Sequence, residues 1–173
     1  MDVGVRVEPD PGGTELALLG EYLDYQRETM LSKTVGLTRV QLAQKHPPSE
    51  LTLAGLLYQL SLVEEDWLEV RFSGLPDREP WAGVDWDNDP DWEFRAAIDL
   101  DPDALQSRYR EACERSRQIV SAATGLDQLS VKALRDGRKF PLRWVLLHLI
   151  EETARHAGHA DFLREAIDGK VGE

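Results

Sequence analysis

The sequence predicts an all-α fold, a four-helix bundle, from three observations. Four long segments repeat apolar residues at steps of three or four, which is the period of a helix with one buried face. Their ends carry capping residues, prolines and glycines. The chain has 173 residues, enough for one domain with a real core and too few for two. We therefore expect one domain over residues 1–173, in which residues 1–13 form an extended lead-in.

The four helices are each bounded by residues that favour helix ends. We expect them at residues 14–33, 53–70, 101–124 and 141–169. Thr14 is suited to an N-cap, and Asp101 followed by Pro102 is a typical helix start. Between these segments, residues 37–45 favour a short helix and residues 126–140 a turn or a short hairpin. Each long helix has one apolar stripe to bury, so packing them together is the natural solution.

The segment from Gly74 to Leu100 interrupts this pattern. It is acidic, rich in Pro and Gly, and has neither helical nor strand periodicity, so we expect a long loop between the second and third long helices. Its three tryptophans favour docking on the bundle, because disordered segments are usually poor in aromatic residues. The acidic run just before it is expected at the surface or its edge. That run comprises Glu64, Glu65, Asp66 and Glu69.

The segment Pro141–Gly169 combines core and site features. Its helical stripe is expected to be the buried face, yet it carries ionisable residues where a packing helix would carry leucines. The stripe consists of Leu142, Val145, Leu149, Glu152, His156, His159 and Leu163. Glu152 and His156 are four residues apart, so their side chains lie one turn apart on one face, as two ligands on one helix require. A catalytic divalent metal typically takes three protein ligands.

The third ligand has to come from another element. The candidates are Gln59, His46 and an acidic loop residue. His148 and His156 are about 12 Å apart along the helix axis, and Glu152 and His159 about 10 Å, so neither trio closes on one ion. A buried Glu–His pair without metal explains the spacing equally well. His148 favours a structural role, and His159 either orients a ligand or caps the core. Cys113 lies in a core-like helix and is expected to be inert.

Composition excludes several classes of function. The formal net charge is −12, and no basic patch is visible, so we expect no nucleic-acid partner. No run approaches the about 20 apolar residues that a spanning helix needs, so we expect no membrane partner. A single cysteine excludes an intramolecular disulfide framework and fits a reducing cytosol. The expected location is therefore cytoplasmic.

Four stretches resemble the DinB-like superfamily. They are TELALLGEYLDYQRETML, PPSELTLAGLLYQLSLVEEDWLE, WEFRAAIDLDPDALQSRYREACERSR and LRWVLLHLIEETARHAGHADFLREAIDG. The nearest branch is an uncharacterised actinobacterial one, related to mycothiol-dependent S-transferases and the maleylpyruvate isomerase metal-binding domain. The resemblance spans Thr14–Gly169 and implies a four-helix bundle, a homodimer, and a divalent metal, zinc or nickel, held between helices.

In that family the metal ligands are a histidine on the second helix and a Glu–His pair on the last. Glu152 and His156 match the pair, and Gln59 stands where the second-helix histidine is expected. An amide oxygen is a neutral, harder and weaker ligand than imidazole. Two readings follow: the site is degenerate and Gln59 hydrogen-bonds Glu152 or His156, or a metal persists with adjustment by Gln59, water or His159.

The resemblance implies a metal-dependent thiol S-transferase. A low-molecular-weight thiol of the mycothiol type would attack a small-molecule electrophile, and His159 or His148 would orient ligands. The loop 74–100 would cover the pocket. The alternative is a non-catalytic bundle of the same family that acts as a binding or stress-associated protein, and the missing histidine favours it.

Overall fold

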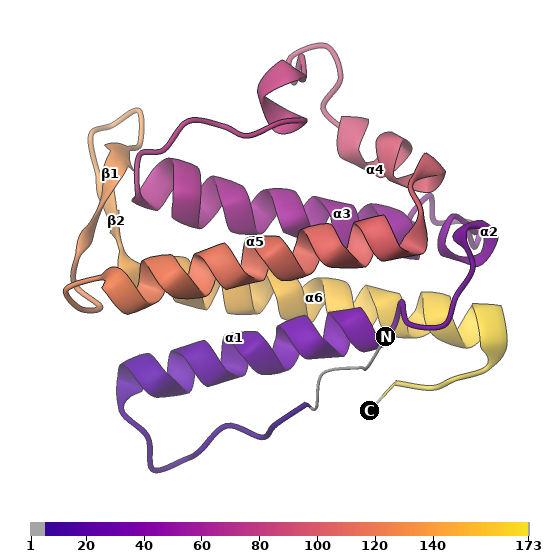
Figure 1. The fold of residues 1–173 in the computed structure, drawn as a ribbon, viewed down its shortest axis with the longest axis horizontal. Coiled ribbons are helices and arrows are strands. Elements are labelled where there is room, and N and C mark those ends of the chain that lie inside the picture. Colours follow the sequence, from indigo (N-terminus) through magenta and orange to yellow (C-terminus); the bar gives the residue numbers. More distant parts are fainter. Residues whose placement is uncertain (1–5, 173) are drawn as a thin grey trace.

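A computed structural model of the chain describes residues 6–172, which are mainly helical (Figure 1). Four long helical segments run side by side: α1 (Glu15–Ser32), α3 (Leu53–Glu64) continued by η1 (Glu65–Phe72), α5 (Pro102–Ala122) and α6 (Leu142–Asp168). The shorter elements are α2 (Arg39–Leu42), η2 (Trp81–Gly83), α4 (Trp92–Ala96), η3 (Ala97–Asp99), β1 (Leu129–Ala133) and β2 (Lys139–Pro141). The prediction of a mainly helical fold is confirmed. No helix in this part of the chain combines the length and apolar character needed to cross a membrane.

Helices α1 and α6 point one way along the molecule, and α3 and α5 point the other way (Figure 1). Helix α6 packs against α1 and α3, and α3 packs against α5. Because α3 and α5 are parallel neighbours, the chain must travel the length of the molecule between them. The segment 73–101 makes this return, which explains why a connection of this length is present.

The ends of the helices lie close to the positions that the sequence predicts. Thr14 is the N-cap of α1, and its hydroxyl accepts a hydrogen bond from the Ala17 N–H. Asp101 precedes α5, with Pro102 at its first position. Gly169 ends α6 in the left-handed conformation, at φ 78°. The predicted lead-in carries no helix or strand over residues 6–13, and its residues 1–5 lie outside the described part.

The second long helix changes its geometry after Glu64. Residues Glu65–Phe72 form a π-helix, in which each turn holds more residues than an α-turn. The predicted surface position of the acidic run is wrong for Glu64, Glu65 and Glu69, which are all buried and paired with arginines of other helices. Asp66 lies at the edge, as expected.

The segment 74–100 is not a plain loop, because it contains the short helices η2, α4 and η3. Trp81 is buried, and its ring lies 4.7 Å from Tyr58 and 6.1 Å from Trp92, measured between centroids. Trp86 and Trp92 pack against the same core cluster. The segment is thus docked on the bundle, as its tryptophans indicated.

Residues 129–141 form an antiparallel hairpin, and its strands β1 and β2 are the strands found within residues 6–172. The sequence was compatible with either a turn or a short hairpin here, and the structure shows the hairpin. Its strand β1 packs against η1. Phe140 of β2 contacts Trp67 edge-on and so ties the hairpin to the second helix.

Candidate functional site on helix α6

Glu152 and His156 lie on α6 at the edge of its buried face. His156 Nε2 is 3.4 Å from Glu152 Oε1, so the pair meets as its spacing predicted. Both side chains are partly buried. The Nδ1 atom of His156 is 3.4 Å from Nδ1 of His159, whose side chain is exposed. The three residues form a chain of polar contacts from the core edge to solvent.

The predicted buried stripe of α6 is wrong in its central part. Thr153, Ala157 and Ala160 are buried where Glu152, His156 and His159 were expected to point inward. The helix therefore places small residues against its neighbours and rotates the ionisable groups toward the rim. The outer ends of the stripe are as predicted, since Leu142 and Leu163 are buried.

The imidazole of His156 favours its neutral form. Burial lowers its pKa below the usual value of 6.5 and is the largest cause. The nearby Glu152 carboxylate raises the pKa and His159 lowers it, and the net direction is downward. A neutral imidazole has a free lone pair, which a metal ion or a hydrogen-bond donor can use.

Gln59 lies on α3, which packs against α6. Its Oε1 atom is buried and has no hydrogen-bond partner within residues 6–172. A buried acceptor without a partner costs free energy, so native structures rarely leave one. In the described chain no group of three His, Cys, Asp or Glu residues is arranged to hold a metal. The Gln59 amide oxygen is therefore a buried acceptor that the described chain leaves unsatisfied.

His148 is engaged in aromatic packing. Its ring stacks on Trp144 with an interplanar angle of 13° and meets Trp67 edge-on at 4.5 Å between centroids. It sits two helical turns from His156. These aromatic contacts fit the structural role that we expected for His148.

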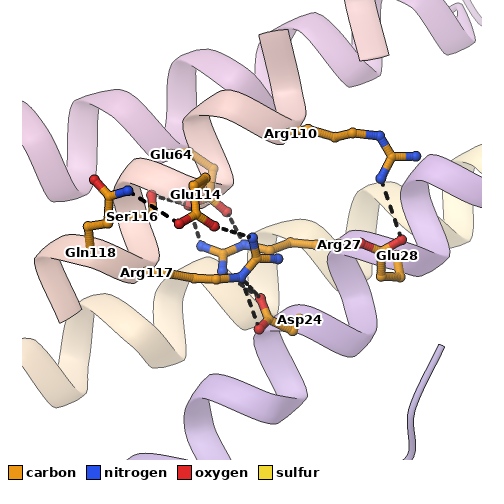
Figure 2. Close-up of polar contacts among 9 residues, drawn as sticks. All are labelled: Asp24, Arg27, Glu28, Glu64, Arg110, Glu114, Ser116, Arg117 and Gln118. Carbon is orange, nitrogen blue, oxygen red and sulfur yellow. Dashed lines mark hydrogen bonds and ion pairs between the residues drawn. The ribbon is translucent and has the colours of Figure 1, made fainter. Parts of the chain in front are cut away.

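A buried polar cluster that sequence reasoning missed lies between α1, α3 and α5 (Figure 2). Arg27 donates from Nε and Nη2 to the two carboxylate oxygens of Glu64, at 2.7 and 2.6 Å. The Ser116 hydroxyl donates to Glu64 Oε2 at 2.7 Å. Asp24 accepts from Arg27 and Arg117. Burial raises the pKa of Asp24, but these arginines outweigh it and the net pKa is lowered.

The π-helix η1 carries a second part of this polar interior. Arg115 of α5 donates to Glu65 at 2.9 Å and to Glu69 at 2.7 Å. Trp81 Nε1 donates to Glu65 Oε2 at 2.9 Å, and Arg78 donates to Glu69. Burial raises the pKa of Glu65 despite the arginines beside it. These contacts fasten the segment 74–100 to the second and third long helices.

Cys113 lies beside this cluster and lines a cavity of about 270 Å³ together with Arg27, Leu31 and Arg110. Burial, with a smaller effect from the Glu64 charge, raises the pKa of its thiol to about 12. Only the thiolate is a strong nucleophile. The Cys113 thiol is therefore unsuited to nucleophilic catalysis.

We expect the native protein to resist alkylation at Cys113. At pH 8 a thiol with a pKa of about 12 is ionised about 1,000-fold less than an exposed cysteine, so iodoacetamide should react with it about 1,000-fold more slowly than in the urea-unfolded chain. Mass spectrometry of timed samples measures both rates. Complete labelling of the folded protein within minutes would contradict a buried Cys113 thiol with a raised pKa.

The fold is mainly helical, with a Glu–His pair on its last long helix. A solved structure described as a conserved protein from Enterococcus faecalis is similar to this chain, with a TM-score of 0.64 and 17% identity. The alignment covers 92% of this chain and 100% of that one, and it shows the shared fold. The mycothiol-S-transferase family matches residues 18–169, so the chain belongs to this family, within the DinB-like superfamily. A search of curated proteins found no match.

Proposed function

We propose that this protein is a thiol S-transferase of the mycothiol type, built on a DinB-like four-helix bundle, with a weakened divalent metal site. Membership of the mycothiol-S-transferase family supports the thiol substrate. The observation that carries the site is the Glu152–His156 contact at 3.4 Å, with a neutral imidazole and a carboxylate on one helix face. We place this activity in the reducing cytosol, where such thiols are kept reduced.

The residues of the proposed site have distinct tasks. Glu152 supplies a charged oxygen donor and His156 a neutral nitrogen donor, while the unpartnered Gln59 Oε1 supplies a third, weaker donor. A bound divalent ion would stabilise the substrate thiolate at neutral pH. Without an ion, a neutral His156 with its proton on Nε2 donates to Glu152, and its Nδ1 accepts from the Nδ1–H tautomer of His159. His159 thereby orients the imidazole ring from the solvent side.

The variant Gln59→His tests the weakened site. We expect the native protein to bind zinc or nickel weakly, and Gln59→His to bind at least about 10-fold more tightly, because imidazole is a stronger ligand for these ions than an amide. Calorimetric titration with each metal, on untagged protein, measures the change. Glu152→Gln in the Gln59→His background should remove most of the gain.

The matched control is Gln118→His on α5. This change places a histidine four residues after Glu114, on an exposed helix face, and so creates a Glu–His pair without a third donor. It should leave metal affinity unchanged. A native protein that retains one tightly bound metal per chain, or a Gln59→His variant that binds no better, would count against the weakened site.

A second candidate is a non-catalytic, binding or stress-associated bundle. The observation that favours it is the lack of a third His, Cys, Asp or Glu ligand in the described chain. The two candidates differ in turnover. Consumption of an electrophile that requires both thiol and metal supports the transferase, whereas thiol binding without turnover supports the binding protein.

A further inference from the structure

A cavity of about 750 Å³ lies where α1 ends and α5 begins, at one end of the bundle (Figure 1). Its walls are the turn 35–38, which follows α1, and residues 101–106 at the start of α5. The volume falls within the about 300–1,000 Å³ of small-molecule sites, and one water occupies only about 30 Å³. The cavity is therefore large enough for an organic ligand.

The turn 35–38 is held in place by contacts on both sides. The buried Arg164 of α6 donates to the Val35 carbonyl oxygen at 3.0 Å. Thr38 is the N-cap of α2 and forms a capping box with Gln41. Gly36, between them, turns the chain at φ 77°, a conformation that favours glycine. A wall that is fixed before binding loses little conformational entropy when a ligand arrives.

The amide of Gln106 has no partner, although the residue is almost fully buried. Gln106 is 5% exposed and lines the cavity, and its amide makes no hydrogen bond within residues 6–172. Side chains on a helix lean toward its N-terminus, so this amide is directed at the first turn of α5. Buried amides in native structures are nearly always paired. A molecule bound in the cavity would supply the missing partner.

The first turn of α5 adds both acceptors and donors to the cavity. The Asp101 side chain makes no capping hydrogen bond, and the Asp103 carboxylate forms no ion pair within the described residues. The first N–H to bond back along the helix is that of Leu105, which donates to the Asp101 carbonyl oxygen at 3.0 Å. The N–H groups of Asp103 and Ala104 precede it and have no intrahelical acceptor.

These groups make conflicting demands on a simple ion. The two carboxylates repel anions, and no Lys, Arg or His of the described chain lines the cavity to offset them. The free N–H groups at the helix N-terminus disfavour cations. A hydroxyl group satisfies both demands, because it donates to a carboxylate and accepts from an N–H. The side chains of Val35, Leu37 and Pro102 add an apolar wall.

We propose that this cavity binds a neutral polyhydroxylated molecule, a cyclitol or a mono- or disaccharide. Its hydroxyl groups donate to the two carboxylates and accept from the free N–H groups of α5, and one of them pairs with the Gln106 amide. The C–H face of the ring packs on the apolar wall. The proposal does not rest on the proposed transferase activity, because the cavity contains neither the Glu152–His156 pair nor Gln59.

Amide NMR on isotope-labelled native protein tests binding directly. The panel consists of glucose, galactose, mannose, myo-inositol, maltose and trehalose. We expect at least one of them to saturate the protein with a Kd below about 10 mM. It should shift the N–H signals of Asp103 and Ala104 more than that of Glu111, which lies on the exposed side of the same helix. Glucose phosphate, calcium and putrescine should each bind at least about 10-fold more weakly than the best neutral compound.

Variants of α5 separate a ligand-binding role from a structural one. Gln106→Leu removes the amide and keeps a side chain of similar size, so the Kd of the best neutral compound should rise at least about 10-fold. Its urea midpoint should stay the same or rise, because no internal hydrogen bond is lost. Asp103→Asn should weaken binding by a similar factor. The matched control Glu111→Gln also removes one negative charge from α5 and should leave the Kd unchanged.

Failure of every neutral compound in the panel to bind would overturn the proposal. Tighter binding of calcium, putrescine or glucose phosphate would do the same, because it would assign the cavity to an ion. A Gln106→Leu variant with native affinity, or one whose urea midpoint falls, would show that the amide does not serve a ligand.

Discussion

Replacing Arg27 by methionine is expected to lower the free energy of unfolding by about 3–5 kcal/mol. Arg27 is 3% exposed and Glu64 is 1% exposed, so water cannot take over the role of the lost guanidinium. The variant leaves the Glu64 carboxylate buried with the Ser116 hydroxyl as its remaining donor in this cluster (Figure 2). Urea unfolding followed by circular dichroism measures the loss.

The double variant Arg27→Met with Glu64→Leu tests whether the loss of stability comes from the unpaired Glu64 carboxylate. Removing both charges eliminates the unpaired carboxylate, so we expect most of the lost stability to return. Arg138→Met is the control, because Arg138 pairs with Asp136 at the exposed hairpin end and should change stability by less than about 0.5 kcal/mol. A loss below about 1 kcal/mol in Arg27→Met would contradict a structural role for the buried pair.

Replacing Trp81 by alanine is expected to cost about 3–5 kcal/mol and to release the segment 74–100 from the bundle. Trp81 fills a buried site between Tyr58 and Trp92, and its indole N–H satisfies the buried Glu65 carboxylate. Limited trypsin digestion provides a direct readout, because Arg78 and Arg95 flank the residue within the same segment. We expect cleavage there to accelerate at least about 10-fold.

Two further variants separate packing from hydrogen bonding. Trp81→Phe keeps most of the ring volume and removes the donor to Glu65, so the expected cost is about 1–2 kcal/mol. Trp86→Ala, at a partly buried position in the same segment, should have a smaller effect than Trp81→Ala. If trypsin cleaves Trp81→Ala no faster than the native protein, Trp81 does not hold the segment in place.

Helix ends were predictable because capping is local chemistry. Thr14, Pro102 and Gly169 act on backbone groups within a few residues of themselves, so the sequence alone reveals their role. The π-helix after Glu64 was not predictable in this way. Its buried carboxylates depend on partners that are distant in the chain, including Arg115, 50 residues after Glu65. A usable signal existed, since Arg108 and Arg115 are seven residues apart and therefore share a helix face.

The candidate site was predictable only in part. The spacing of Glu152 and His156 fixed their mutual contact, because both lie on one rigid helix. The inward direction was misjudged for the central part of this face, where small residues such as Ala157 take the buried positions. A small residue gives a weak apolar signal, so the neighbouring ionisable residues were assigned to the stripe instead. His148 was placed by Trp67, a residue of another helix.

The pairing of α1 with α6 has a consequence for synthesis of the chain on the ribosome. Leu23 of α1 shares a buried cluster with Leu142, Val145 and Leu149 of α6, which emerge more than a hundred residues later. Until then, the apolar face of α1 lacks its main partner, and the nascent chain exposes it to chaperones and proteases. Native contacts between such distant segments also slow folding relative to helical proteins that rely on neighbouring segments. A fragment that stops short of α6 should therefore fail to fold.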